Sequence, residues 1–237
     1  MSRFANFLVD SIAFEVRFHH KWSLWDRAGA LWHDISGLWQ NVDQVVAEPN
    51  TQAFTFGNYD VKIQPDRALL VQRLPDLEAD DFAERCGVVY KLVVQHLEIK
   101  ILTRIGLRIR GIRQTSGREE GAQLLRQTGL FAAPHHTFNV HGEDISLERI
   151  IVLEAGSRGV RLHIRNEERK WNFAVPFAMP ADSAEASRQV SGTLYGAMAD
   201  VDYYVRSDTR VGSFEATSWI SDGVRVIARD IRALLRE

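Results

Sequence analysis

The sequence predicts an α+β protein in which helices pack on a mainly antiparallel, curved β-sheet and a helix closes the chain. Three observations lead to this prediction. Few strand–helix–strand units have the spacing of a doubly wound fold. Two long segments, 99–113 and 193–206, alternate apolar and polar residues, as half-buried strands do. The region 147–177 has the pattern of a meander of short antiparallel strands.

Composition sets the limits of this interpretation. The chain has 237 residues, 45% hydrophobic content and a formal net charge of −2, so it can bury a large core and is not disordered. We expect an N-terminal α+β half over 1–131 with a tryptophan-rich helix, and a C-terminal meander plus helix over 145–237. One continuous domain fits the length equally well. The near-zero net charge argues against a surface that binds nucleic acid all over.

The first half of the chain gives clear element signals. A strand is expected at 12–18, a helix from Ser23 to about Val46, and short strands at 54–56, 59–64 and 68–74. Asp76 could cap a helix through about Leu97. The inward side chains of that helix would be Phe82, Cys86, Val89, Val93 and Leu97.

The long strand 99–113 follows, with Ile99, Ile101, Thr103, Ile105, Leu107 and Ile109 on its apolar face. Capping-box patterns are expected to open two helices, Ser23 with Asp26 in the first and Ser116 with Glu119 in a short one ending near Thr128.

The second half predicts strands at 147–155, 160–166 and 171–177, then a loop or weak helix at 180–190. The strand 193–206 leads to a closing helix from about Ser221. Val224, Ile227, Ile231 and Leu234 would face inward on that helix.

Tryptophans repeat with a seven-residue period near the start of the chain. Leu24-Trp25, Leu31-Trp32 and Leu38-Trp39 form a heptad seam, and three tryptophans widen its apolar flank. The pattern favours a helix packed on the sheet. An interface made by Trp25, Trp32 and Trp39 with a second copy or a partner helix is the next interpretation. A membrane-surface helix is disfavoured because the polar face is acidic.

Charged residues share faces on the two long strands. Arg104, Arg108 and Arg110 lie on one face of 99–113 and could bind a phosphate or a carboxylate. Asp200 and Asp202 share a face of 193–206, so cross-strand Arg–Asp pairing would satisfy both sets if the strands are neighbours. Pairing is the favoured interpretation, ahead of anion binding and of a metal site at the two aspartates.

Catalytic motifs are absent from the sequence, and no catalytic residue, cofactor or metal is expected. There is no nucleophile elbow, dinucleotide fingerprint or phosphate loop. His135, His136 and His141 lie in the expected loop 132–144 at spacings that match no common zinc pattern. Cys86, the single cysteine, is expected to pack within a helix, which indicates a reducing compartment.

Three segments carry a family resemblance: Phe14-Glu-Val-Arg-Phe18, Arg104-Ile-Gly-Leu-Arg108 and Ala199-Asp-Val-Asp-Tyr203. In this order and at these distances, they resemble a sporadically distributed family of bacterial proteins with no assigned function. Ile109-Arg110-Gly111 departs from the Tyr-Ile-Asn that usually continues the middle segment. The resemblance implies a bacterial cytoplasmic protein and supplies no activity.

The sequence therefore favours a non-enzymatic protein of the bacterial cytoplasm that self-associates as a homodimer or binds another protein. The alternative is a nucleic-acid or anion binder that uses the arginine strand face. No signal peptide or membrane-spanning segment is expected.

Overall fold

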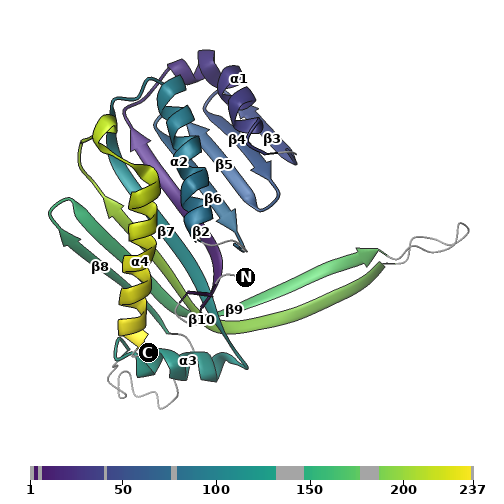
Figure 1. Ribbon diagram of the computed structural model, residues 1–237. Helices are drawn as coiled ribbons and strands as arrows, with labels where there is room; N and C mark the ends of the chain where they lie inside the picture. The colour runs from purple at the N-terminus through teal and green to yellow at the C-terminus, as the bar shows by residue number, and fades with distance from the viewer. Residues whose placement is uncertain are drawn as a thin grey trace, which may run out of the picture. The chain divides into compact units, whose positions relative to one another are not determined.

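The computed structural model describes residues 3–4, 7–39, 42–75, 79–131, 147–176 and 187–235 (Figure 1). It confirms the α+β class: the strands form an antiparallel sheet that is not closed, and the chain ends in a helix. The order along the sheet is β3-β4-β5-β6-β2-β7-β10-β9-β8, with β1 added to β2 and β11 to β7. The strands are β1 (Arg3–Phe4), β2 (Phe7–Phe18), β3 (Gln44–Glu48), β4 (Thr51–Phe56), β5 (Tyr59–Gln64), β6 (Arg67–Arg73), β7 (Ile101–Thr115), β8 (Glu148–Ala155), β9 (Arg158–Pro176), β10 (Ser187–Val205) and β11 (Thr209–Arg210). The helices are α1 (Ser23–Ser36), α2 (Ala79–His96), α3 (Arg118–Gln127), α4 (Ala216–Leu235) and a short 3₁₀ turn (Val211–Ser213).

The chain divides into two compact units. Unit 1 comprises Met1–Ile112, Ile150–His163 and Ala199–Glu237, and unit 2 comprises Arg113–Arg149 and Ile164–Met198. Each unit draws segments from both of the ranges 1–131 and 145–237. In unit 2, α3 buries Ala122 and Leu125.

In unit 1, α1, α2 and α4 cover one face of the sheet (Figure 1). Aromatic contacts join the layers: the Phe14 ring of β2 lies 6.5 Å from Tyr90 of α2 and 6.2 Å from Trp219 of α4. Gly223 of α4 allows close packing on the sheet, since a Cβ there would lie 2.8 Å from Leu107. The predicted inward side of α2 is confirmed, and Phe82, Cys86, Val89, Val93 and Leu97 are all buried.

The prediction of a helix from Ser23 to Val46 is wrong in its second half. Helix α1 ends at Ser36, and Val45 lies in β3, where it pairs with Phe54 of β4. The heptad pattern depends only on the spacing of nearby residues. Pairing with β4 satisfies the backbone hydrogen-bonding groups of 44–48, and the spacing of these residues does not reveal that partner strand. The third tryptophan of the repeat therefore lies outside the helix.

The two capping boxes are also corrected. The Ser23 hydroxyl is buried without a hydrogen-bond partner, and α1 has no side-chain cap. At α3, Ser116 pairs with Glu120 instead of Glu119, through its backbone N–H and its hydroxyl, each 2.7 Å from Oε2. Helix α4 begins five residues before the predicted Ser221, at Ala216.

A bulge in β7 changes its predicted alternation. Arg17 pairs with Arg104 and Phe18 with Leu102, so Thr103 is an extra residue opposite β2. Leu102 is consequently buried and Ile101 is 38% exposed, although the strict alternation placed Ile101 inside. From Ile105 onward the predicted faces hold.

The predicted strand 160–166 and residues 171–176 of the next predicted strand belong to one strand, β9, and residue 177 lies outside the described residues. β10 begins at Ser187, inside the predicted loop 180–190. The remainder of that loop and the loop 132–144, with His135, His136 and His141, lie outside the described residues.

Candidate functional site

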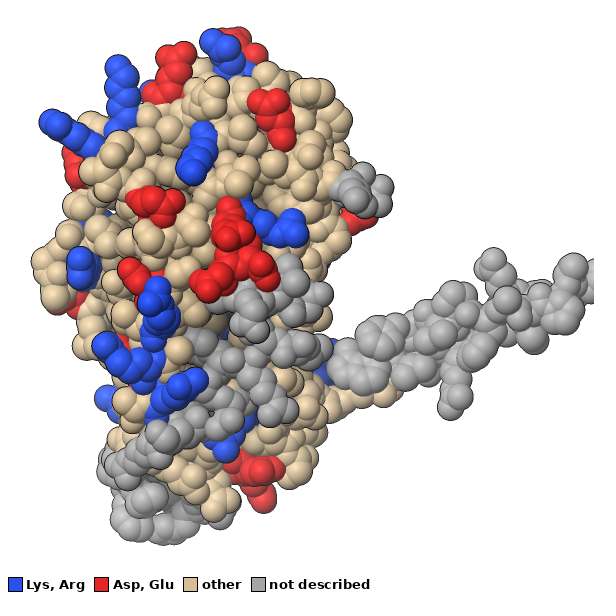
Figure 2. Space-filling model, viewed as in Figure 1, with Lys and Arg blue, Asp and Glu red and all other residues tan. Residues whose placement is uncertain are grey.

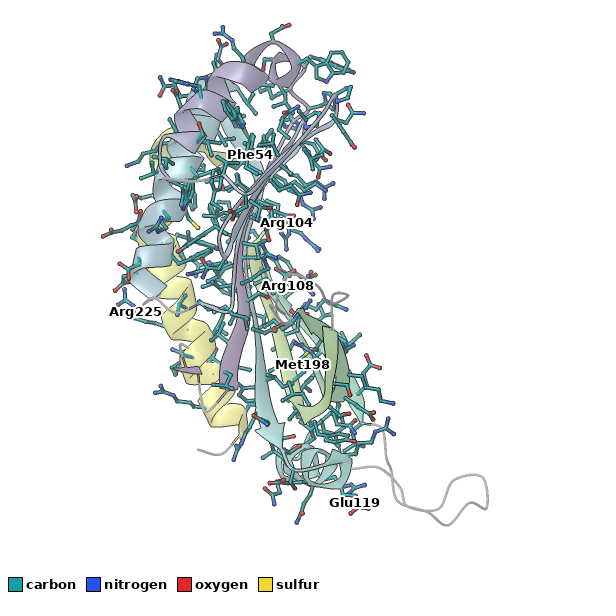
Figure 3. All side chains as sticks on the ribbon, turned by 90° about the vertical axis from the view of Figure 1, so that its right-hand side faces the viewer. Phe54, Arg104, Arg108, Glu119, Met198 and Arg225 are labelled. Atoms are coloured by element: carbon teal, nitrogen blue, oxygen red, sulfur yellow. The ribbon has the colours of Figure 1, made fainter. Side chains whose placement is uncertain are left out.

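The face of the sheet that α1, α2 and α4 leave uncovered in unit 1 carries a cluster of arginines and carboxylates. Arg104 and Arg108 project from this face, on the opposite side of the sheet from the helices (Figure 3). Side chains alternate between the two faces of each strand, so the face opposite the charged cluster carries the apolar residues that pack against the helices. On the helix-bearing face itself, acidic and basic side chains are interspersed, and basic ones gather over α4 (Figure 2).

Arg104 is the centre of the cluster. Its guanidinium donates to Glu15 of β2 at 2.5 Å and to both carboxylate oxygens of Asp202 of β10 at 2.8 Å. It lies over Gly106, where a Cβ would be 2.5 Å from Arg104 Nη1. The ring of Tyr204 lies 5.2 Å from the guanidinium carbon. The missing side chain at Gly106 thus leaves room for an arginine that joins three strands.

A second group surrounds Asp200, which is only 4% exposed. Arg108 donates to it through Nε at 2.6 Å and Nη2 at 2.5 Å. Burial, the largest single influence, would by itself raise the pKa of Asp200. The hydrogen bonds from Arg108 and the positive charges of Arg108 and Arg110 together outweigh burial and hold that pKa below its ordinary value. Arg110 lies between two carboxylates, 3.7 Å from Asp200 and 3.8 Å from Asp10. Its buried Nε has no hydrogen-bond partner.

An open hollow of about 660 Å³ lies over this cluster, with Ala13, Leu69 and Val71 as its apolar part. The charged side chains of the cluster differ in how much they are exposed to solvent. The side chains of Asp200, Glu15 and Asp10 are 5%, 17% and 20% exposed. Those of Arg108, Arg17 and Arg73 are 48%, 42% and 53% exposed. These three carboxylates are therefore less exposed than the guanidiniums of Arg108, Arg17 and Arg73, whereas Arg104, with a side chain 12% exposed, lies as deep as the carboxylates.

The structure contains the cross-strand pairing that the spacing of the Arg and Asp residues favoured. β7 and β10 are neighbours, Arg104 pairs with Asp202 and Arg108 with Asp200. Sequence reasoning missed Glu15, Gly106 and Tyr204. The alternation of Phe14 to Phe18 placed Glu15 on the polar side of a strand, but nothing in it indicated which strand lies alongside. The segments 14–18, 104–108 and 199–203 supply Glu15, Arg104, Arg108, Asp200 and Asp202, and so meet at this cluster.

A second surface lies on α1. Leu24, Leu31 and Ile35 are fully buried on its inner side, and Asp34 is 2.7 Å from His96 of α2. On its outer flank, Trp22, Trp25 and Trp32 are 63%, 52% and 38% exposed. The rings of Trp22 and Trp25 are in edge contact, with centroids 4.9 Å apart. Gly29 lies between Trp25 and Trp32 at helical spacing, and we name Trp22, Trp25, Gly29 and Trp32 the tryptophan stripe.

Trp39 does not belong to the stripe. It follows α1, stacks on Phe56 of β4 with ring centroids 4.5 Å apart, and its indole N–H is buried without a hydrogen-bond partner. The guanidinium of Arg85 lies 5.9 Å from its ring. The structure thus places two of the three tryptophans of the expected interface on one surface, whereas the third is half-buried and stacks on Phe56.

Other chemistry is limited among the described residues. Cys86 is buried, and burial raises the pKa of its thiol well above the ordinary value, which makes it a poor nucleophile. In the part of the chain that the structure describes, no three His, Cys, Asp or Glu side chains gather as metal ligands. None of the helices described here is long and apolar enough to cross a membrane.

Comparisons with known proteins add no relative. No model of a known protein family matches the chain, and a search of curated proteins finds no match either.

Proposed function

We propose that this chain is a non-enzymatic protein that self-associates, with the tryptophan stripe of one copy packed against the stripe of a second copy. The observation that carries the proposal is the exposure of Trp22, Trp25 and Trp32 on one flank of a helix whose other flank is fully buried. Tryptophan is enriched in the energetic centres of protein interfaces, where burying its large ring excludes water.

Gly29 supports a helix as the partner of this stripe. A glycine within a helix costs about 1 kcal/mol relative to alanine. Nothing in the described part of the chain requires it, because a Cβ at Gly29 would meet none of its atoms within 4 Å. A glycine between two tryptophans opens a gap in the surface, into which a ring of a second copy can insert. Two copies related by a two-fold axis would exchange this contact reciprocally.

Fluorine NMR of protein labelled with 5-fluorotryptophan tests the proposal at the stripe itself. We expect the resonances of Trp25 and Trp32 to shift or broaden between about 10 and 300 μM protein, the range where a micromolar contact forms. The resonances of Trp39 and Trp219, which are half-buried against Phe56 and Phe14 and lie outside the stripe, serve as controls and should not move.

Gly29→Gln provides the matched variant. Glutamine is a better helix former than glycine, so the variant should fold at least as well while its side chain fills the gap. Its Trp25 and Trp32 resonances should be independent of concentration. Unmoved resonances in the unsubstituted protein, or shifts that survive Gly29→Gln, would contradict the proposal.

A second candidate function is the binding of a small anion in the hollow. It is favoured by one observation: the guanidiniums of Arg108 and Arg110, which line the hollow, lie nearer to solvent than Asp200. Paired carboxylates beneath the arginines make the cluster nearly neutral, which suits one phosphate or carboxylate group better than a polyanion.

Thermal unfolding in the presence of inorganic phosphate or citrate tests this candidate. A bound anion should raise Tm progressively with concentration, and Arg110→Gln should remove the increase. Sodium chloride at matched ionic strength is the control. If duplex DNA binds with a log-linear salt dependence while phosphate and citrate have no effect, the small-anion candidate is wrong and a phosphate-backbone contact replaces it.

A further inference from the structure

Strand β8 ends the sheet order, and no strand of the described part of the chain pairs with its outer edge. Its centre, Ile150-Ile151-Val152-Leu153, contains no charge and no proline. Ile150, Val152 and Leu153 are 50%, 53% and 64% exposed. Edge strands of natural proteins are usually protected by charges, prolines or bulges, because an open edge recruits another strand. The centre of β8 has none of these protections.

Hydrogen bonding to β9 shows which backbone groups of β8 point outward. The N–H of Asn166 in β9 donates to the C=O of Leu147 at 3.0 Å, and the hairpin turns at Gly156, whose φ is 61°. Bonds to one neighbour recur at every second residue of an antiparallel strand. Residues 149, 151, 153 and 155 therefore point their backbone groups at β9. The N–H and C=O of Ile150, Val152 and Glu154 point at the open edge.

We propose that this edge pairs with the same edge of a second copy, antiparallel and centred on Val152. A two-fold axis perpendicular to the sheet requires that paired residue numbers add to an even number, because only then do both side chains lie on one face. Pairing Val152 with Val152 sets Ile151 against Leu153 and Ile150 against Glu154. The alternative centred on Ile151 would set Glu148 against Glu154, and like charges directly opposite are destabilising.

The register uses the outward backbone groups. Val152 of each copy exchanges two hydrogen bonds with Val152 of the other, and Ile150 exchanges two with Glu154. The occupant is a second copy because the strand is complementary to itself in this register: apolar residues meet at the centre and no like charges are opposed.

The β8 contact is separate from the tryptophan stripe and does not depend on it. Only the expectation that copies assemble beyond a dimer rests on the proposed function as well. β8 forms the end of the sheet order opposite to β3 and β4, whereas α1 lies at the β3 and β4 side (Figure 1). A chain with two different two-fold contacts is joined to two other copies, so assembly does not stop at a dimer.

Light scattering on five proteins tests the inference. Val152→Pro removes one outward N–H and leaves the bonds to β9, and proline is tolerated at such positions of edge strands. The stripe variant carries Trp25→Ser and Trp32→Ser. We expect the average mass of the unsubstituted chain to exceed that of a dimer at about 100 μM, the range of a micromolar contact. Each single-contact variant should have twice the chain mass of 27.0 kDa, and the combined variant should be a monomer. Val152→Thr keeps the N–H and should behave as the unsubstituted chain.

The possible failures are distinguishable. A monomeric stripe variant would overturn β8 pairing while leaving the proposed function intact. A monomeric Val152→Pro protein with unchanged circular dichroism would overturn the stripe and retain the β8 pairing.

A single introduced cysteine tests the register. Opposed Val152→Cys residues would have Cα atoms about 5.5 Å apart, within the range of a disulfide. Mild oxidation should therefore cross-link Val152→Cys at least tenfold faster than Leu153→Cys, whose partner in the register is Ile151. Cys86 is buried and does not compete. Faster cross-linking of Ile151→Cys would move the centre of pairing to Ile151, and equal rates at all three positions would contradict ordered pairing.

Discussion

Replacing Arg104 by leucine is expected to lower the free energy of unfolding by about 3 kcal/mol, because removing one partner of a buried ion pair leaves the other charges uncompensated. The Arg104 side chain is 12% exposed, and its partners Glu15 and Asp202 are 17% and 26% exposed. Both carboxylates would remain in the sheet without the guanidinium that joins them. Chemical denaturation followed by circular dichroism measures the loss.

Arg17→Leu is the matched control for this prediction. Arg17 also contacts Glu15, at 2.8 Å, but its side chain is 42% exposed, and ion pairs of that exposure contribute about 1 kcal/mol or less. We expect Arg17→Leu to cost at least 2 kcal/mol less than Arg104→Leu, by difference of the two effects. Equal losses for the two variants would show that Arg104 does not hold the strands together.

Gly159→Ala is expected to lower the free energy of unfolding by about 2 to 3 kcal/mol through overpacking. A Cβ at Gly159 would lie 2.5 Å from Cε2 and 2.6 Å from the hydroxyl oxygen of Tyr204. The ring has little room to move, because Tyr204 is 3% exposed and its hydroxyl donates to Glu154 at 2.7 Å. Denaturant unfolding measures the cost.

A double-mutant cycle separates this collision from a general effect of alanine in β9. In a Tyr204→Ala background, Gly159→Ala should cost less than about 1 kcal/mol, because the ring that it meets is gone. Gly212→Ala, where a Cβ would meet no atom of the described residues within 4 Å, should be close to neutral. If the cost at Gly159 is unchanged without the Tyr204 ring, the collision is not its cause.

The sequence predicted correctly those elements in which the buried side chains recur at the regular spacing of a helix or a strand. The inward side of α2 and the polar face of β7 from Arg104 onward are examples, since each depends on alternation along one segment. The second half of the tryptophan helix failed for the converse reason. Residues 44–48 pair with β4, and no feature of their own spacing records that partner. The bulge at Thr103 likewise depends on the register with β2.

The candidate sites show the same division. Two aspartates and three arginines at alternate positions predicted an Arg–Asp network. Its full form needed the strand order that brings Glu15 to one side of Arg104 and Asp202 to the other. The role of Gly106 follows only from the path of the Arg104 side chain across it. On α1, spacing predicted Trp25 and Trp32 together, whereas the exposure of Trp22 and the gap at Gly29 required the packed structure.

Sedimentation equilibrium of the Val152→Pro protein, with and without Trp25→Ser and Trp32→Ser, is the most direct test of self-association through the tryptophan stripe. Val152→Pro removes the β8 contact, so the remaining mass reports on the stripe alone. We predict a concentration-dependent mass that approaches twice 27.0 kDa when the tryptophans are present, and a mass of 27.0 kDa at every concentration when they are replaced. A mass of 27.0 kDa for both proteins would contradict the proposed function.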